Sequence, residues 1–177
     1  MADWEQKRNE QRAQKDEFFE EHPQSPIPRD ERDDFSGLSY YPLDDSYRFE
    51  VELTPFDDHE TLTVETTQDG TQRYYRWGKF HFELGGEEYA LTAYKGDPTE
   101  TRLWAPFRDE TSGEETYGAG RYLDLDAEDR SDGTWQLDFN AAYNPFCAYN
   151  EHYECSLVPR ENWLDVRIEA GEKSVQQ

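Results

Sequence analysis

The chain of 177 residues carries 41 acidic against 18 basic side chains, which gives a formal net charge of −23. Its 5 Trp, 12 Tyr and 10 Phe supply enough apolar surface for the core of one folded domain, so a disordered chain is excluded. Direct binding of nucleic acid or of an anionic membrane is excluded as well, because no basic patch is present to release phosphate counterions.

The acidic residues are spread along the whole chain, and lysine is scarce. Molar salt shortens the Debye length to about 3 Å and therefore screens the mutual repulsion of such a coat. We expect a soluble, cytoplasmic protein of an extreme halophile, and the alternative is an acidic protein from an organism that lives at ordinary salt. The sequence shows no signal peptide, transmembrane run or lipidation motif.

Residues 3–22 predict an N-terminal α-helix, which Pro23 ends because the residue before a proline avoids the helical region. Three large apolar side chains lie on this helix: Trp4, Phe18 and Phe19. Residues 24–34 contain two prolines and predict a wrapping arm. We therefore divide the chain into residues 1–34, the helix and arm, and residues 35–177, a single β domain.

Beyond residue 35, apolar and polar side chains alternate with a period of two, as is typical of half-buried strands. Asp69-Gly70 and Gly85-Gly86 are turn sequences that join such segments into hairpins. About nine strands are predicted, at residues 47–53, 62–66, 72–77, 80–84, 87–94, 102–105, 122–125, 134–139 and 164–169. The sequence thus predicts an all-β domain, an antiparallel barrel or sandwich, with one N-terminal helix and a proline-containing arm.

Residues 139–150 form the longest stretch without a charged side chain, and asparagine and aromatic residues fill much of it. Amides and phenols must find hydrogen-bond partners when they leave water. A segment that is uncharged but rich in such groups indicates the wall of a pocket or a tightly networked loop. Four of its residues are candidates for orienting a ligand: Asn140, Tyr143, Asn144 and Tyr149.

A second stretch, residues 106–125, is expected to face the first. Its glycine pair leaves backbone N–H groups open to a ligand, and its two arginines are suited to hold a carboxylate or phosphate. The alternative is that both arginines pair with nearby carboxylates. The ligand-binding candidates of this stretch are Arg108, Tyr117, Gly118, Gly120 and Arg121. The competing carboxylates are Asp109, Glu114, Glu115 and Asp124.

Both stretches contain long motifs. They are Phe107-Arg108-Asp109, Thr111-Ser112-Gly113, Glu115-Thr116-Tyr117-Gly118, Gly120-Arg121-Tyr122-Leu123-Asp124-Leu125, Asp138-Phe139-Asn140, Ala142-Tyr143-Asn144-Pro145 and Cys147-Ala148-Tyr149. Together they resemble the signature of domain of unknown function 1684, an uncharacterised family of archaea and bacteria, in its haloarchaeal form. The similarity covers nearly the whole chain. The family has no established activity, so the resemblance implies kinship of fold and little about chemistry.

Glu115 and Asp138 are the candidate catalytic residues. A pair of carboxylates serves general acid–base chemistry when burial separates their pKa values. Asp138 begins the uncharged run and is expected to meet Arg108 or Arg121. The alternative is a buried Asp–Arg ion pair that holds two loops together.

Cys147 and Cys155 are the two cysteines of the chain, and His152 lies between them. A metal site, a disulfide, and a Cys147 nucleophile with His152 as base are three interpretations of this spacing. We favour a fourth, small buried thiols among aromatic rings, because the cytosol is reducing and a structural zinc site normally has four ligands. No metal is therefore predicted.

These features predict a pocket for a small anionic or polar molecule, in which Arg121 and Asn144 enclose a single chamber. Hydrolysis with Asp138 or Glu115 as base is the enzymatic version of this prediction. The alternative is a non-catalytic protein-interaction module whose two loops lock each other. The sequence indicates no particular cofactor and no oligomeric state.

Overall fold

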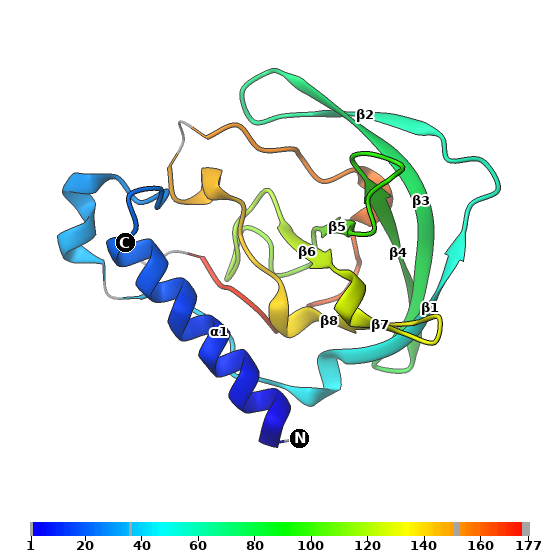
Figure 1. Ribbon diagram of the computed structural model, residues 1–177, viewed down its shortest axis with the longest axis horizontal. Coiled ribbons are helices and arrows are strands. Elements are labelled where there is room, and N and C mark those ends of the chain that lie inside the picture. Colours follow the sequence, from blue (N-terminus) through cyan, green and yellow to red (C-terminus); the bar gives the residue numbers. More distant parts are fainter. Residues whose placement is uncertain (1, 36, 151–152, 175–177) are drawn as a thin grey trace.

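A computed structural model describes residues 2–35, 37–150 and 153–174 of the chain. It contains one α-helix, α1 (Ala2–Glu21), and a curled antiparallel sheet (Figure 1). Eight strands lie in these ranges: β1 (Arg48–Pro55), β2 (Thr61–Glu65), β3 (Thr71–Leu84), β4 (Glu87–Lys95), β5 (Leu103–Phe107), β6 (Arg121–Leu125), β7 (Arg130–Ser131) and β8 (Thr134–Asp138). The predicted fold class, an antiparallel all-β body with one N-terminal helix, is confirmed, and the sheet curls into a half-barrel.

The strands follow the order β6-β5-β4-β3-β1-β8-β7, and β2 pairs with β3 beside this path. The 14-residue length of β3 makes this possible, because residues 71–75 pair with β2 and residues 78–80 pair with β1. A β-bulge between Arg76 and Gly78 increases the local bend of β3. The predicted strands 72–77 and 80–84 are therefore two halves of one strand.

The core lies inside the curl of the sheet. Alternate residues of β5 and β6 point to opposite faces, so Leu103 and Leu123 are buried in the core while Trp104 and Tyr122 point outward. The fully buried apolar side chains at its centre include Phe80, Leu91, Phe107, Leu137, Phe139 and Ile168. Each of these contributes about 1.5–3 kcal/mol by leaving water.

The predicted strand at residues 164–169 is wrong. This segment is irregular, and the carbonyl of Ile168 accepts a hydrogen bond from the Arg121 guanidinium, not from a neighbouring strand. The sequence analysis also missed β7, a two-residue strand that pairs with the start of β8.

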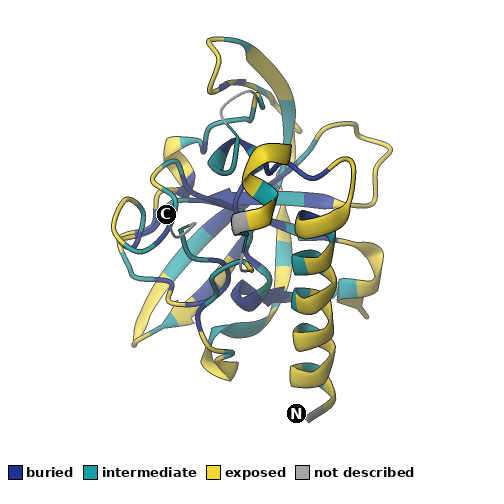
Figure 2. Ribbon diagram, turned by 90° about the vertical axis from the view of Figure 1, so that its left-hand side faces the viewer, coloured by how far each residue is buried: buried dark blue, intermediate teal, exposed yellow. Residues whose placement is uncertain are grey.

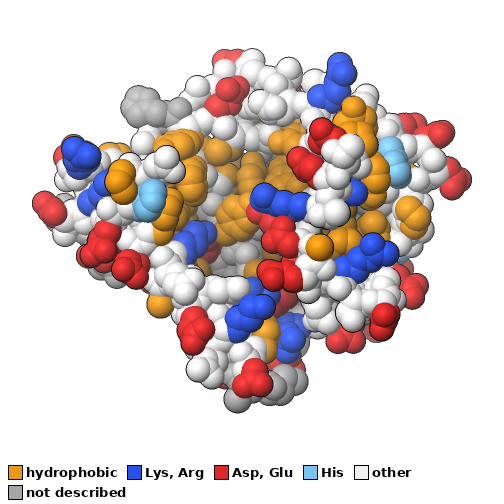
Figure 3. Space-filling view, viewed as in Figure 1, with side chains coloured by type: hydrophobic (Ala, Val, Ile, Leu, Met, Phe, Trp, Pro, Cys, Tyr) orange, Lys and Arg blue, Asp and Glu red, His pale blue; other side chains and the backbone are white. Residues whose placement is uncertain are grey.

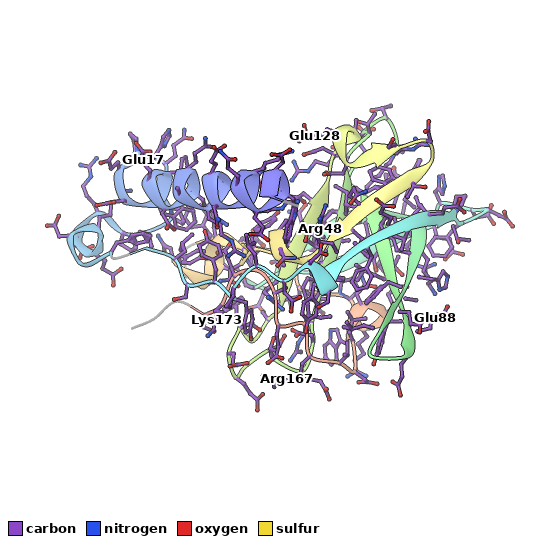
Figure 4. All side chains as sticks on the ribbon, turned by 90° about the horizontal axis from the view of Figure 1, so that it is seen from below. Glu17, Arg48, Glu88, Glu128, Arg167 and Lys173 are labelled. Atoms are coloured by element: carbon purple, nitrogen blue, oxygen red, sulfur yellow. The ribbon has the colours of Figure 1, made fainter. Side chains whose placement is uncertain are left out.

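Helix α1 lies along one side of the body, with an outer face that is largely exposed (Figures 2 and 4). Its inner face is mostly polar. Its contacts with the body include five side chains spaced three or four residues apart: Trp4, Arg8, Arg12, Lys15 and Phe19. Side chains at this spacing share one face of a helix. The helix therefore docks through cations as well as through its two aromatic anchors.

The arm that follows α1 folds back against the end of the helix. The Ser25 hydroxyl donates a 2.6 Å hydrogen bond to the carbonyl of Phe19, and Ser25 and Ile27 are buried. A short 3-10 helix, Arg29–Asp34, completes the arm. The arm thus packs on the helix and is not an extended linker.

Candidate ligand-binding bowl

The structure brings the two predicted stretches together. The backbones of Tyr122 and Tyr143 exchange two hydrogen bonds, of 2.8 and 3.0 Å, in an isolated antiparallel bridge. Further along, the Tyr117 hydroxyl lies 3.5 Å from the Cys147 sulfur. Segments 106–125 and 139–150 therefore pack against each other in the fold.

Arg121, expected to hold an anion, is instead completely buried. Its guanidinium donates to the carbonyl groups of Ile168 (2.8 Å), Ala170 and Glu172 (3.2 Å), and it pairs with Asp109 at 3.4 Å. Burial lowers the pKa of Arg121 below its ordinary value. The ion pair with Asp109 is the alternative stated from the sequence, and Arg121 ties the C-terminal segment to β6.

Asn144 and Tyr149 are tied to the same C-terminal segment. The Asn144 amide donates to the Lys173 carbonyl (2.9 Å) and to the Tyr149 hydroxyl (3.2 Å), and that hydroxyl donates to the Glu172 carboxylate. Burial raises the pKa of Tyr149, so its hydroxyl remains a donor. Arg121 and Asn144 thus bind the carbonyls of consecutive residues, and the chain between 168 and 173 lies where the sequence analysis expected an open chamber.

The two candidate catalytic carboxylates are also engaged with protein groups. Asp138 accepts hydrogen bonds from the Trp4 indole (2.9 Å), from Arg8 (3.0 Å), and from the backbone and side chain of Asn140. Asn140 in turn exchanges hydrogen bonds with the backbone of Asp44. Asp138 therefore forms the kind of buried Asp–Arg pair stated as the alternative, although its partner is Arg8 on α1 and not Arg108 or Arg121.

Glu115 lies at the surface near the C-terminal segment. It accepts a hydrogen bond from the Tyr41 hydroxyl (3.0 Å) and pairs with Arg167. Burial, together with the hydrogen bond to Glu115, raises the pKa of Tyr41 to about 12. Glu115 is thus part of a surface ion-pair network.

Arg108, Gly118 and Gly120 lie around the loop between β5 and β6. The Arg108 guanidinium stacks 4.3 Å above the Trp163 ring and lines a separate cavity of about 470 Å³ beside β2. Gly120 has φ +106°, and a Cβ there would lie 2.6 Å from the Phe107 carbonyl oxygen. Gly118 is exposed. Of these three residues, Gly120 is therefore the one whose backbone conformation and close packing require glycine.

A bowl of about 810 Å³ lies on the outer face of the sheet. We call it the aromatic bowl. Its aromatic lining consists of Tyr74, Tyr94, Trp104, Tyr122 and Tyr143. In the space-filling view this face of the molecule is hollowed, with hydrophobic side chains in the depression (Figure 3). Of the predicted ligand-binding residues, Tyr143 alone lines it.

The rings of the aromatic bowl form a continuous row. Tyr74 stacks on Trp104 with 4.4 Å between ring centroids, and Trp104 meets Tyr122 edge to face at 5.1 Å. Tyr122 meets Tyr143 edge to face at 5.9 Å. Contacts of this kind contribute about 0.5–1.5 kcal/mol each and hold the rings in fixed orientations. The wall of the bowl is therefore preorganised.

One carboxylate dominates the polar part of the wall. Asp124 pairs with Arg102 at 2.6 Å and accepts a hydrogen bond from the Tyr143 hydroxyl, both through Oδ2. Its other oxygen, Oδ1, is buried and has no hydrogen-bond partner among the described residues. Buried polar atoms in native proteins are nearly always paired, so this oxygen is an acceptor in need of a donor.

The charge of the lining is predominantly negative. Glu100, Asp124 and Glu154 contribute three carboxylates, against the guanidinium of Arg102. Burial is the main cause that raises the pKa of Tyr122 and Tyr143, so both phenols stay protonated. The bowl therefore offers aromatic faces and acceptor oxygens, a combination suited to cations.

Most residues of this site were not predicted from the sequence, among them Arg102, Trp104, Tyr122 and Asp124. A signal was present, because Trp104 alternates with Leu103 and Ala105, and Tyr122 alternates with Leu123. Aromatic residues on the face of a strand opposite its aliphatic residues indicate that the second face is also covered or lines a site.

Cys147 and Cys155 are free thiols that lie side by side, and Cys155 lines the aromatic bowl. The backbone N–H of Cys147 donates to the Cys155 sulfur at 3.4 Å. A hydrogen bond from Cys155 lowers the pKa of the Cys147 thiol to about 6, whereas the pKa of Cys155 is raised by the same contact. His152, the base or third ligand considered from the sequence, lies outside the described residues.

No cluster of three or more His, Cys, Asp or Glu side chains suited to a metal ion occurs within residues 2–35, 37–150 and 153–174. In the same ranges, no helix is long and apolar enough to cross a membrane.

Taken together, the fold and the site define an acidic all-β protein. It is an antiparallel half-barrel with one N-terminal helix docked on its side and an aromatic bowl on its outer face. Residues 33–173 match the family described as "Protein of unknown function (DUF1684)", and the chain belongs to that family. The resemblance expected from the motifs is thereby confirmed.

A related solved structure is the solution NMR structure of an uncharacterized protein from Haloarcula marismortui. It shares 45% sequence identity with this chain at a TM-score of 0.75, and the match covers 97% of this chain and 95% of the other. The origin of this relative agrees with the expected haloarchaeal type. A search of curated proteins finds no match.

Proposed function

We propose that the protein binds a small polar molecule in the aromatic bowl, and that the group it recognises is a protonated amine. The unpartnered Oδ1 of Asp124 is the observation that carries this proposal. A bound amine would place its charge beside the Asp124 carboxylate in the lining, and a hydrogen bond to a charged acceptor contributes about 1.5–3 kcal/mol.

The aromatic rings support a cation in the same place. An ammonium group over the face of a Trp or Tyr ring gains about 0.5–2 kcal/mol, and the gain is largest where water is excluded. Trp104 and Tyr122 lie on the same face of the β5–β6 pair as Asp124. An anion, the ligand class expected from the arginines, would instead meet three carboxylates in this lining.

The proposal is for binding without chemistry. Asp138 and Glu115, the carboxylates considered for hydrolysis, do not line the bowl, and both are engaged with cations of the protein. The rigid row of rings also suits recognition, because a preorganised site avoids the entropy cost of ordering its side chains on binding.

Calorimetric titration of alkyl amines and of their uncharged alcohol analogues tests the proposal. We expect amines to bind and alcohols of the same shape to bind at least about tenfold more weakly, since the alcohol lacks the charge. Trp104→Leu and Asp124→Asn should each weaken amine binding about tenfold, by removing a ring face or the carboxylate charge. Trp163→Leu, a change at an exposed tryptophan away from the bowl, is the matched control.

Equal affinity of the wild type and Trp104→Leu for every amine would contradict the proposal. So would equal binding of amines and alcohols, because the carboxylate would then have no part in recognition.

A further inference from the structure

A second cavity lies beneath α1, and Tyr143 lines both this cavity and the aromatic bowl. It has a volume of about 200 Å³ and is lined by basic residues of the helix and by residues of the body. Its basic residues are Arg8, Arg12 and Lys15, which lie on one face of α1. In a chain with 41 acidic and 18 basic residues, three cations at one small cavity require an explanation.

Two of these cations are neutralised by buried carboxylates. Arg8 pairs with Asp138 at 3.0 Å, and Lys15 pairs with Glu172. Both carboxylate side chains are at most 5% exposed. These two ion pairs contribute to the docking of the helix, and they leave the third cation, Arg12, without a carboxylate of its own.

Arg12 has no ion pair among the described residues. Its guanidinium donates to two backbone carbonyls, those of Tyr41 (3.0 Å) and Asn140 (3.3 Å), and lies 4.3 Å above the Tyr40 ring. Burial lowers the pKa of Arg12 despite the longer-range attraction of Asp138 and Glu172. A partly desolvated guanidinium of this kind attracts an anion strongly.

Tyr40 supplies a second, independent observation. Its hydroxyl is buried and has no hydrogen-bond partner within the described part of the chain, and the residue lines the same cavity as Arg12. Burial raises the pKa of Tyr40, so the hydroxyl keeps its proton and is a donor. An unpaired buried donor next to an unpaired cation requires an acceptor that carries negative charge.

We infer that the cavity beneath α1 binds a small inorganic anion such as chloride, held between the Arg12 guanidinium and the Tyr40 hydroxyl. The volume of about 200 Å³ admits a halide or a small oxyanion. Because the site includes residues of both the helix and the body, a bound anion would stabilise the docked position of α1. This site is separate from the proposed amine site, and neither inference depends on the other.

Two measurements test the inference. In both, chloride replaces gluconate, a bulky anion, at constant potassium concentration. The first is the excess line width of the ³⁵Cl NMR signal, which reports chloride bound to the protein. The second is the midpoint of thermal unfolding, which should rise with chloride and then saturate, as expected for a ligand that binds the folded state alone. The variants are Arg12→Met and Tyr40→Phe, with Lys7→Met as a control that changes charge at an exposed position of the same helix.

We expect Arg12→Met to abolish the chloride-specific rise and the excess line width. Tyr40→Phe keeps the ring under Arg12 and should weaken chloride binding about tenfold or more, by one hydrogen bond to a charged group. Lys7→Met should behave as the wild type. If chloride and gluconate are equivalent for the wild type, or if Tyr40→Phe and Lys7→Met show the same chloride response, the inference is overturned. Tyr40→Phe decides the question even if Arg12→Met fails to fold.

Discussion

The replacement Arg121→Met tests whether this arginine is a scaffold residue or a ligand-binding one. Methionine has a similar length but no donors, so the carbonyls of Ile168, Ala170 and Glu172 lose a buried partner. Each orphaned acceptor costs about 1–3 kcal/mol, and a buried carboxylate left unpaired costs about 3–5 kcal/mol. Asp109 would lose its cation, although it keeps hydrogen bonds from Thr111, Ser112 and the Ile168 N–H. The combined loss exceeds about 5 kcal/mol, which is comparable to the whole stability of a typical domain, about 5–15 kcal/mol.

Urea unfolding at fixed KCl, followed by tryptophan fluorescence and circular dichroism, measures this loss. We expect Arg121→Met to be unfolded, or to unfold at a much lower urea concentration than the wild type. Arg73→Met, at an exposed position of β3, should leave the midpoint unchanged. The double variant Arg121→Met/Asp109→Asn should lose less than the sum of its single variants, because the two side chains share one interaction. A wild-type urea midpoint for Arg121→Met would refute the assignment and return Arg121 to the list of ligand-binding candidates.

Two further predictions concern the thiol pair and the β5–β6 loop. Iodoacetamide should alkylate Cys147 with a midpoint near pH 6, and Cys155→Ala should raise that midpoint by removing the hydrogen bond that lowers the pKa. The stability that the Cys147 thiolate contributes is fully present above the ordinary pKa of 9.0 and is lost as pH falls through about 6. An alkylation midpoint above pH 8 would contradict the lowered pKa of Cys147. Gly120→Ala should destabilise the protein more than Gly86→Ala. Both positions have positive φ, which costs an alanine about 1–3 kcal/mol, but of the two only Gly120 would also place its Cβ against a backbone carbonyl. Equal urea midpoints for the two variants would refute that explanation.

The β body was predictable because local rules determine it. Period-two alternation located seven of the eight strands, and the glycine turns at 70 and 85–86 marked the hairpins correctly. The union of residues 72–77 and 80–84 into β3 was not predictable from alternation, since a bulge interrupts the period and resembles a strand end.

The docking of α1 was underestimated for a different reason. Only its aromatic residues were counted as contacts, whereas Arg8 and Lys15 reach buried carboxylates more than a hundred residues away in the sequence. A basic residue on a helix is usually solvated, and nothing local distinguishes one that meets a buried acid. Long-range pairing of this kind follows from the fold and not from the helix sequence.

Little of the candidate site was predictable, because Tyr143 alone of the predicted ligand-binding residues lines the aromatic bowl. The contact between segments 106–125 and 139–150 was expected and is present, and Tyr143 does line a cavity. The C-terminal residues 168–173 were treated as peripheral, yet their carbonyls take up the donors of Arg121 and Asn144. Backbone acceptors leave no trace in residue type, so a sequence cannot distinguish an arginine that binds a ligand from one that binds its own chain.

The central claim is that the aromatic bowl is a binding site for an amine. The five tryptophans report on it directly, because Trp104 alone lines the bowl, while Trp4, Trp77, Trp135 and Trp163 lie elsewhere. In ¹⁹F NMR of protein labelled with 5-fluorotryptophan, titration with an alkyl amine should shift the Trp104 resonance and leave the Trp4 resonance in place. An amine that leaves the Trp104 resonance unmoved at saturating concentration, or that shifts all five equally, would contradict the claim.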